Sequence, residues 1–275
     1  MDKILFIDAH NAMWRACVKF GAVQPDVPDE VIFTFNFFRN LRPLIEDFAP
    51  DKCFFVLEGH PQFRYDLFTD YKANRLVKNA EARKESNERF LKTKDIILPI
   101  MRFLPITTCR AANYEADDVI ATLCENMKDE DLTVLSNDSD YIQLLQRGYQ
   151  NIGIYNPIKK EFMEAPEYPY VAWKCLNGDK SDNIPALLKP KKSIETVKDP
   201  EKFEKFLSVD ENRSNFNINR QLIEFHPVPE EEIAFSEGTR QFELLKQAFT
   251  DMKFETIIND KSWEKFCKTF DCLRY

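Results

Sequence analysis

The chain has 275 residues, of which 44% are hydrophobic, and a formal net charge of −8. This length can bury one large core, with or without a smaller appended domain. No segment approaches the ~20 apolar residues that span a bilayer, and the first apolar run is too short for a signal peptide. We therefore expect a cytoplasmic protein with no membrane partner.

Short apolar segments alternate with helical patterns in the first part of the chain. We expect strands at Lys3 to Ile7, Lys52 to Leu57 and Leu132 to Leu135, because each is short and rich in Ile, Val, Phe or Leu. The clearest helical periodicity runs from Glu30 to Phe48. Strands that alternate with helices indicate an α/β fold with a mostly parallel central sheet.

Residues 60–100 are charged and only weakly periodic. One interpretation is a solvated helix and loop on the surface; the other is a mobile basic insertion that guides a polyanion. The second interpretation is favoured by Lys72 and Arg75, which on a helix would be spaced to grip adjacent phosphates, and by Tyr71, which could stack on a base.

Helical patterns dominate after about residue 165 and are punctuated by several prolines. We therefore divide the chain into a core over residues 1–165 and a mainly helical region over residues 166–275. Seven scattered cysteines without a Cys-x-x-Cys pair indicate buried thiols. The chain has only three histidines, so the sequence gives little support for a histidine metal site or for a Ser/His/Asp triad.

Nine acidic residues form short clusters, most of which directly follow an apolar run. Two carboxylates 4 Å apart repel by about 4 kcal/mol at an effective dielectric constant of 20, so such a gathering needs cations, and divalent ions bound by oxygen suit it. Taking nine negative charges from the total of −8 leaves +1 for the rest of the chain. The nine residues are Asp8, Glu58, Glu115, Asp117, Asp118, Asp138, Asp140, Asp179 and Asp182.

Asp8, Glu58 and the pair Asp138 and Asp140 each follow the carboxyl end of a predicted strand. In open α/β sheets these ends form the ligand-binding edge, so we expect the side chains to converge there. Glu115 to Asp118 begin a predicted helix. A lone instance of that segment would be read as a solvated helix start with favourable charges, but the other clusters favour a metal site.

Five motifs occur in an order that resembles the 5′ nuclease family, which includes flap endonucleases, the 5′ to 3′ exonuclease domain of bacterial DNA polymerase I and phage 5′ nucleases. The resemblance covers most of the chain. The motifs are Ile7-Asp8, Phe63-Arg64 with Tyr71-Lys-Ala-Asn-Arg75, Tyr114-Glu-Ala-Asp-Asp118, Ser136-Asn-Asp-Ser-Asp-Tyr-Ile-Gln-Leu144, and Gly178-Asp-Lys-Ser-Asp-Asn-Ile-Pro185.

Two departures from the family pattern stand out. Glu58 occupies a position where the family usually has Asp, which lengthens the side chain by one methylene. The segment from Ala186 to Lys192 has no glycine, whereas most members carry a glycine-rich helix-hairpin-helix there. In this second feature the chain looks like the ribonucleases H of T-even phages, a branch of the same family.

The resemblance implies a PIN-like nuclease with a helical arch at about residues 60–100 and a helical DNA-binding region that completes the metal site. It implies two Mg²⁺ ions, for which Mn²⁺ can substitute, held by the nine acids. Asp8, Glu115, Asp117 and Asp138 would hold the catalytic ion and Asp140, Asp179 and Asp182 the second, while Glu58 and Asp118 are further ligands not assigned to one ion. Lys72 and Arg75 would clamp the scissile phosphate.

By the same resemblance, Arg64 and the basic stretch would guide a single-stranded 5′ end, Tyr71 would bind nucleic acid by stacking on a base, and Lys189, Lys191 and Lys192 would contact duplex backbone. The implied substrates are branched or 5′-ended DNA and RNA–DNA hybrid, and the implied role is removal of RNA primers and flaps in bacterial or phage replication. A single-strand-binding protein or a clamp would be a partner of the monomer.

Three alternatives are kept open. A PIN-type single-strand ribonuclease would share the acidic edge. A phosphatase with an aspartyl nucleophile would need an acid at position 10, where this chain has His10. A non-catalytic DNA-binding replication protein would show no metal-dependent cleavage.

Overall fold

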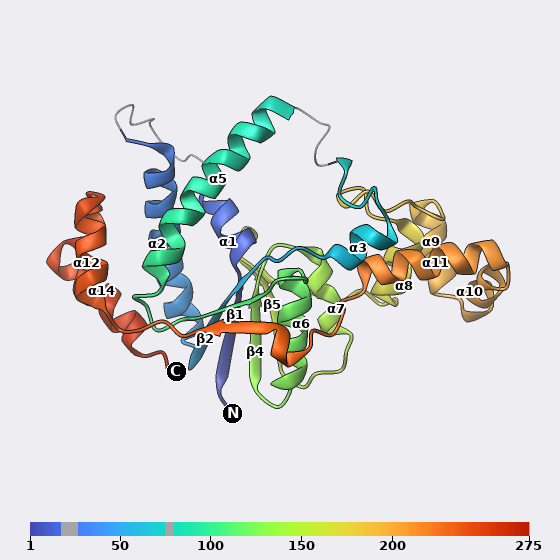
Figure 1. Ribbon diagram of the computed structural model, residues 1–275. Coiled ribbons are helices and arrows are strands. Elements are labelled where there is room, and N and C mark those ends of the chain that lie inside the picture. Colours follow the sequence, from blue (N-terminus) through green and yellow to red (C-terminus); the bar gives the residue numbers. More distant parts are fainter. Residues whose placement is uncertain (18–26, 75–79, 275) are drawn as a thin grey trace.

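Within residues 1–17, 27–74 and 80–274, which the computed structural model describes apart from the side chains of 80–83, one seven-stranded sheet carries helices on both faces (Figure 1). Its strands are β1 (Lys3–Asp8), β2 (Lys52–Leu57), β3 (Thr107–Ala111), β4 (Asp131–Leu135), β5 (Ile152–Asn156), β6 (Glu161–Phe162) and β7 (Ile233–Ser236). They lie in the order β6-β5-β4-β1-β2-β3-β7. Pairing is parallel from β5 to β3, and the edge strands β6 and β7 pair antiparallel.

The predicted α/β class is confirmed, and the three predicted strands are β1, β2 and β4. The two faces of β1 explain why the sheet is buried on both sides. Leu5 and Ile7 belong to a core under α1 (Ala9–Ala16), α2 (Asp29–Phe48) and α5 (Ala80–Met101). Ile4 and Phe6 belong to the opposite core, under α6 (Ala116–Asn126) and α7 (Ile142–Leu145).

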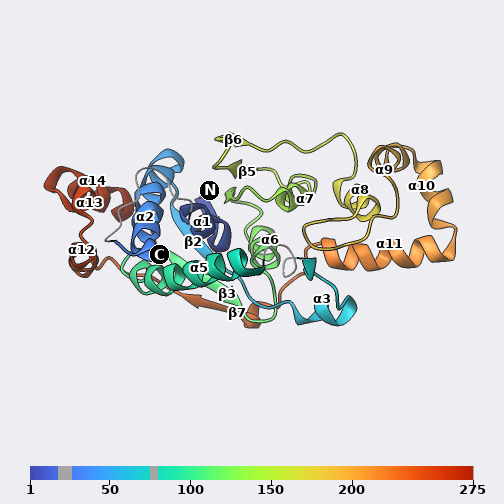
Figure 2. The ribbon, with the colours of Figure 1, turned by 90° about the horizontal axis from the view of Figure 1, so that it is seen from above.

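A third hydrophobic cluster forms a helical lobe beside the sheet (Figure 2). The lobe contains α8 (Tyr170–Asn177), α9 (Pro190–Val197), α10 (Pro200–Leu207) and α11 (Asp210–Ile223), and the short α3 (Gln62–Leu67) packs against α11. None of the helices in the described ranges is long and apolar enough to cross a membrane.

Residues 166–275 are mainly helical, as predicted, but they also contain one strand that was not expected. After the lobe the chain returns to the sheet, where β7 pairs with β3. The last helices, α12 (Phe242–Asp251), α13 (Glu255–Ile258) and α14 (Asp260–Asp271), then join the same core as α2 at the other end of the molecule. This part of the chain is therefore not a single helical body, and the boundary near residue 165 stays a prediction.

The strand order determines where a ligand can be met. From β1 the chain passes to β2 and β3 on one side of the sheet, and later to β4 and β5 on the other. The connections therefore leave in opposite directions at the carboxyl ends of β1 and β4. Such a switch point is where open α/β sheets bind ligands.

Candidate active site

Acids from distant segments of the chain lie at the carboxyl edge of the sheet. We use the name acidic site for the nine acids predicted from the sequence, which are Asp8, Glu58, Glu115, Asp117, Asp118, Asp138, Asp140, Asp179 and Asp182. Asp8 is the last residue of β1, Glu58 follows β2, and Asp138 lies just beyond β4. Burial raises the pKa of the Tyr141 phenol well above its ordinary value. The negative charges of four of these acids add to the increase, namely Asp8, Asp117, Asp138 and Glu58.

Asp8 both caps a helix and faces the acidic site. Its Oδ1 accepts a hydrogen bond from the backbone N of Asn11 at 3.0 Å, which caps α1. Its Oδ2 lies 3.1 Å from Ser136 Oγ and 3.4 Å from the Tyr141 hydroxyl. These neutral donors do not offset burial, which raises the pKa of Asp8 to about 6, with a further increase from the charge of Asp138.

Glu58 uses its extra methylene to reach the start of α6, where its Oε2 accepts a hydrogen bond from the backbone N of Ala116 at 3.0 Å. Burial raises the pKa of Glu58 to about 7, and the neighbouring charge of Glu115 adds to the effect. Glu58 therefore lies within the acidic site despite its departure from the family's usual Asp.

Three acids cluster at the first turn of α6. Glu115 is the N-cap and forms a capping box with Asp118. One carboxylate oxygen each from Glu115, Asp117 and Asp118 lie within 4.8 Å of one another, which suits a metal ion. Burial, followed by the charges of Asp118 and Glu115, raises the pKa of Asp117 well above its ordinary value.

Asp118 is fully buried, and its hydrogen bonds favour a positioning role over the predicted metal contact. Its Oδ2 accepts from Arg64 at 2.6 Å, and its Oδ1 accepts from Arg64 at 2.8 Å and from the backbone N of His226 at 2.8 Å. These donors occupy the oxygens that a cation would need. The metal assignment of Asp118 remains a prediction.

Arg64 does not lie where a guide for a single strand should lie. Its side chain is 1% exposed. Besides Asp118, its guanidinium donates to Glu115 Oε2 at 2.8 Å and to the backbone O of Leu222 at 3.2 Å, at the end of α11. The predicted contact of Arg64 with nucleic acid is therefore wrong for this conformation: the residue ties α3 to α6 and to the helical lobe.

Tyr71 and Lys72 lie in a turn and not on the expected helix, with Lys72 at a φ of 58°. Tyr71 is 3% exposed, and its hydroxyl lies 3.0 Å from Glu115 Oε2, so it is not available to stack on a base. Lys72 pairs with Glu115 and lies 3.8 Å from Asp182 Oδ2. Arg75 lies outside the described residues.

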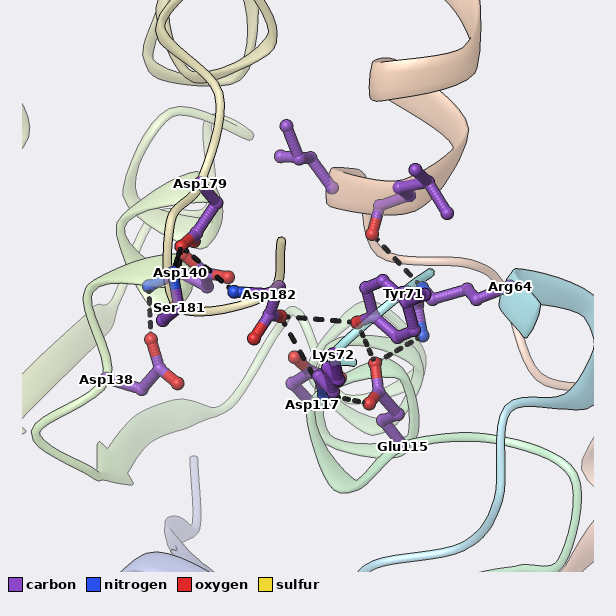
Figure 3. A network of polar contacts seen from close by, with 12 residues as sticks. Arg64, Tyr71, Lys72, Glu115, Asp117, Asp138, Asp140, Asp179, Ser181 and Asp182 are labelled. Atoms are coloured by element: carbon purple, nitrogen blue, oxygen red, sulfur yellow. Dashed lines mark hydrogen bonds and ion pairs between the residues drawn. The ribbon is translucent and has the colours of Figure 1, made fainter. Parts of the chain in front are cut away.

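The remaining acids, Asp140, Asp179 and Asp182, lie on the lobe side of the acidic site (Figure 3). Sequence reasoning missed their neighbour Lys174, a 6% exposed residue in the last turn of α8. Its ammonium pairs with Asp140 and lies 2.8 Å from Asp179 Oδ2. The available signal was a single charge in the otherwise apolar helix Tyr170–Asn177.

Asp140 and Asp179 both contact Lys174, but their pKa values are shifted in opposite directions. Burial raises the pKa of Asp140 to about 6 although Lys174 opposes it. For Asp179 burial also acts upward, but the Lys174 ammonium and the hydrogen bonds from Ser181 outweigh it and lower the pKa to about 2. The backbone N and Oγ of Ser181 donate to Asp179 Oδ1 at 2.7 and 2.6 Å.

An aromatic group next to Asp8 was also missed. His10 and Trp14 lie one turn apart on α1, with nearly parallel rings whose centroids are 6.1 Å apart. Phe90 of α5 packs against both rings, at 4.7 and 5.3 Å. Trp14 is 42% exposed, so the group presents an aromatic surface on α1, the helix that Asp8 caps.

Lys189, Lys191 and Lys192 are exposed at the start of α9. In the segment before them, the backbone N atoms of Leu187 and Leu188 both donate to Leu176 O at 2.9 Å and so are not available to a phosphate. Pro190 at the first turn of α9 removes a further amide donor. The predicted contacts of these three lysines with duplex backbone remain predictions.

We expect the metal-free protein to be more stable at pH 5.5 than at pH 8. Asp8, Glu58 and Asp140 have raised pKa values in the fold. Such groups stabilise the fold below their unfolded pKa, and this contribution is lost as the pH rises through about 6 to 7. The loss begins at about pH 4, so between pH 5.5 and pH 8 it amounts to about 1 kcal/mol for Asp8 and about 2 kcal/mol for Glu58, and the difference in Tm should be about 5 °C.

Thermal melting in EDTA at the two pH values measures this difference. Addition of Mn²⁺ at pH 8 should restore the Tm, because a divalent ion replaces the protons. A metal-free protein that melts higher at pH 8 than at pH 5.5 would contradict the expectation.

Comparison with known proteins agrees with this geometry. Residues 3–170 match the model of the 5′–3′ exonuclease N-terminal resolvase-like domain. The chain is 28% identical to a 5′–3′ exonuclease of Bacillus subtilis over 82% of this chain and 83% of that protein. It is 25% identical to DNA polymerase I of Bacillus subtilis over 81% of this chain, but it spans only 26% of that polymerase.

Solved structures support the fold. The bacteriophage T5 D15 flap endonuclease, in a complex with DNA and metal ions, aligns with a TM-score of 0.65 and 16% identity over 98% of both chains. The catalytic core of Rad2 with a DNA substrate aligns with a TM-score of 0.58 and 16% identity over 98% of this chain and 92% of that chain. Because the family model matches residues 3–170, which are more than half of the chain, this chain belongs to the 5′–3′ exonuclease family of 5′ nucleases.

Proposed function

We propose that this protein is a divalent-metal-dependent nuclease that hydrolyses phosphodiester bonds at 5′ ends and 5′ flaps of DNA and of RNA–DNA hybrids. The observation that carries the proposal is the gathering of carboxylates at the carboxyl edge of the sheet. Asp8 ends β1, Glu58 follows β2, and one oxygen each of Glu115, Asp117 and Asp118 lie within 4.8 Å of one another at the start of α6. Within the described residues, no lysine or arginine forms an ion pair with Asp8, Glu58, Asp117 or Asp138.

The donor set fits Mg²⁺, which prefers carboxylate oxygens and retains several of its waters. Asp8, Glu115, Asp117 and Asp138 would hold the catalytic ion, and Asp140, Asp179 and Asp182 the second. When bound, the ions lower the pKa of a water and neutralise charge that develops on the phosphate. Asp118 would act through Arg64, and Glu58 would support the start of α6 as well as the ion.

Cationic side chains near the acidic site would attract a phosphate into it and offset its negative charge. Lys72, which already lies against Glu115, would turn toward the scissile phosphate, and Arg75 follows it by three residues. Lys189, Lys191 and Lys192 would hold duplex backbone on the outside of the lobe. The DNA and metal ions named for the T5 D15 flap endonuclease complex support this assignment.

We further propose that the protein removes RNA primers and flaps during DNA replication in a bacterium or a phage. The match to the 5′–3′ exonuclease part of DNA polymerase I supports a replicative role. The related phage T5 enzyme supports a phage setting. A single-strand-binding protein or a clamp would deliver the substrate to the monomer.

A labelled 5′-flap DNA, an RNA-primed duplex and a single-stranded RNA, each incubated with and without Mg²⁺, test the proposal. We expect Mg²⁺-dependent release of the flap and of the primer, and little cutting of the free RNA. Cleavage of the single-stranded RNA alone would instead indicate a PIN-type ribonuclease. No cleavage of any substrate would indicate a non-catalytic DNA-binding protein.

Trp14 should contribute a stacking surface for a base next to the scissile phosphate. A Trp14→Ala variant should cut the flap about 10- to 100-fold less efficiently, since base stacking on an aromatic side chain contributes about 1 to 3 kcal/mol. Trp14→Tyr should retain most of the activity. Phe235→Ala, which removes an aromatic ring that is 48% exposed on the edge strand β7, is the matched control. Equal effects of Trp14→Ala and Phe235→Ala would rule out a stacking role.

A further inference from the structure

The two halves of the acidic site differ in how their charges are balanced. Among the acids assigned to the first ion, Asp8 accepts hydrogen bonds from the neutral donors Asn11, Ser136 and Tyr141, whereas Glu115 is paired with Lys72 and with Arg64. Asp140 and Asp179, by contrast, share one buried ammonium, that of Lys174. This asymmetry concerns the same carboxylates that would hold the two ions, so it bears on how each ion binds.

The position of the Lys174 ammonium overlaps with the place of a metal ion. It contacts one oxygen of Asp140 and lies 2.8 Å from one oxygen of Asp179, so it sits between the two carboxylates. A divalent ion bridging these oxygens would lie about 2.1 Å from each. Both cations cannot occupy that point, because they would repel each other at short range in a poorly hydrated site.

The ammonium is also held in place. Its side chain is 7% exposed and belongs to the last turn of α8, just before Gly178. Gly178 has a φ of 69° and packs tightly against the backbone of residues 184–186, so the loop that carries Asp179 follows the helix in a defined direction. Asp179 is bonded to Ser181 in the same loop and closes onto Lys174. The pair is therefore built into the fold.

We propose that Lys174 is an internal counter-cation of the second metal position, which a divalent ion must displace before it can bind between Asp140 and Asp179. Lys174 is thus a positioning residue that weakens the binding of the second ion. This inference rests on the proposed function, because it assumes that the acidic site takes divalent ions. The flexible four-carbon side chain of Lys174 allows the displaced ammonium to rotate away from the two carboxylates without movement of α8.

Titration of the metal-free protein with Mn²⁺ in the absence of nucleic acid, followed by electron paramagnetic resonance of free Mn²⁺, tests the proposal. The wild type should bind one ion tightly and a second at least about 10-fold more weakly. Lys174→Met and Lys174→Gln should both bring the second affinity at least about 10-fold closer to the first. Lys174→Arg, which keeps a cation, should bind the second ion as weakly as the wild type.

Lys180→Met is the matched control, because Lys180 is exposed in the same loop and its loss changes the net charge equally. It should leave the second affinity within about 2-fold of the wild type, since an exposed charge is screened by salt. Melting in EDTA provides a second readout: Lys174→Gln should melt below the wild type, and Mn²⁺ should raise its Tm by more than it raises that of the wild type.

An Mn²⁺ isotherm that is the same for the wild type, Lys174→Met and Lys174→Gln would overturn the inference. Two equally tight sites in the wild type would do so as well. If the wild type cuts flaps while the isotherms coincide, only the role of Lys174 fails. If the wild type neither binds Mn²⁺ nor cuts, the proposed function fails together with it.

Discussion

Asp138→Asn should abolish Mg²⁺-dependent cleavage of a 5′ flap, by about 10³-fold or more, while the fold and the affinity for DNA are retained. The substitution removes one negative charge from the acidic site, where the charge of Asp138 also raises the pKa of Asp8. Loss of an anionic ligand weakens the hold on an ion that contributes several kcal/mol of transition-state stabilisation. The effect should appear in the rate under single-turnover conditions.

The local structure around Asp138 makes this substitution a clean one. Asp138 caps the short 3₁₀-helix Ser139–Tyr141, because its Oδ1 accepts from the backbone N of Asp140 at 2.9 Å. An asparagine oxygen can accept the same hydrogen bond, so the turn should remain intact. Asp138 is also exposed, which limits any effect on folding.

The matched control is Asp129→Asn, which makes the same chemical change in the turn that precedes β4, whereas Asp138 follows the other end of that strand. This variant should cut the flap at the rate of the wild type. Binding of the flap in Ca²⁺ or EDTA, measured by fluorescence anisotropy, should be unchanged in both variants. An active Asp138→Asn enzyme would remove Asp138 from the catalytic residues.

The edge of the sheet could be predicted from the sequence because its signal is local. An apolar run such as Lys52–Leu57 is followed directly by an acid, and the parallel order of the strands then brings these acids together. The edge strand β7 could not be recognised. It is only four residues long, follows three consecutive acids, and buries only Ile233.

Charge partners could not be predicted, because the sequence shows a charge but not what lies against it. Arg64 was counted with a basic stretch although its partner Asp118 is 54 residues away. Lys174 was passed over although its partner Asp140 is 34 residues away. Arg64 was expected in solvent, and Lys174 was not considered. Both cations are buried because a carboxylate that is distant in the sequence compensates for their loss of hydration. The acids themselves were found because several of them had to share one edge.

Arg64→Ala should destabilise the fold by about 3 to 5 kcal/mol, because it leaves the carboxylate of Asp118 buried without a charged partner. The Tm should fall by about 10 °C. The same change should loosen the lobe from the core, since Arg64 also donates to the backbone O of Leu222 at the end of α11. Thermal melting and hydrogen exchange of α11 measure the two effects.

Arg213→Ala is the matched control for Arg64→Ala, because Arg213 lies on α11 and pairs with Asp210 while remaining 55% exposed. Exposed ion pairs contribute about 0 to 1 kcal/mol, so its Tm should change little. The double variant Arg64→Met with Asp118→Leu should be less destabilised than the sum of its single variants, because no charge remains unpaired between the two positions. An Arg64→Ala protein that melts like the wild type but binds DNA poorly would instead place Arg64 at the nucleic-acid surface and contradict the buried pairing.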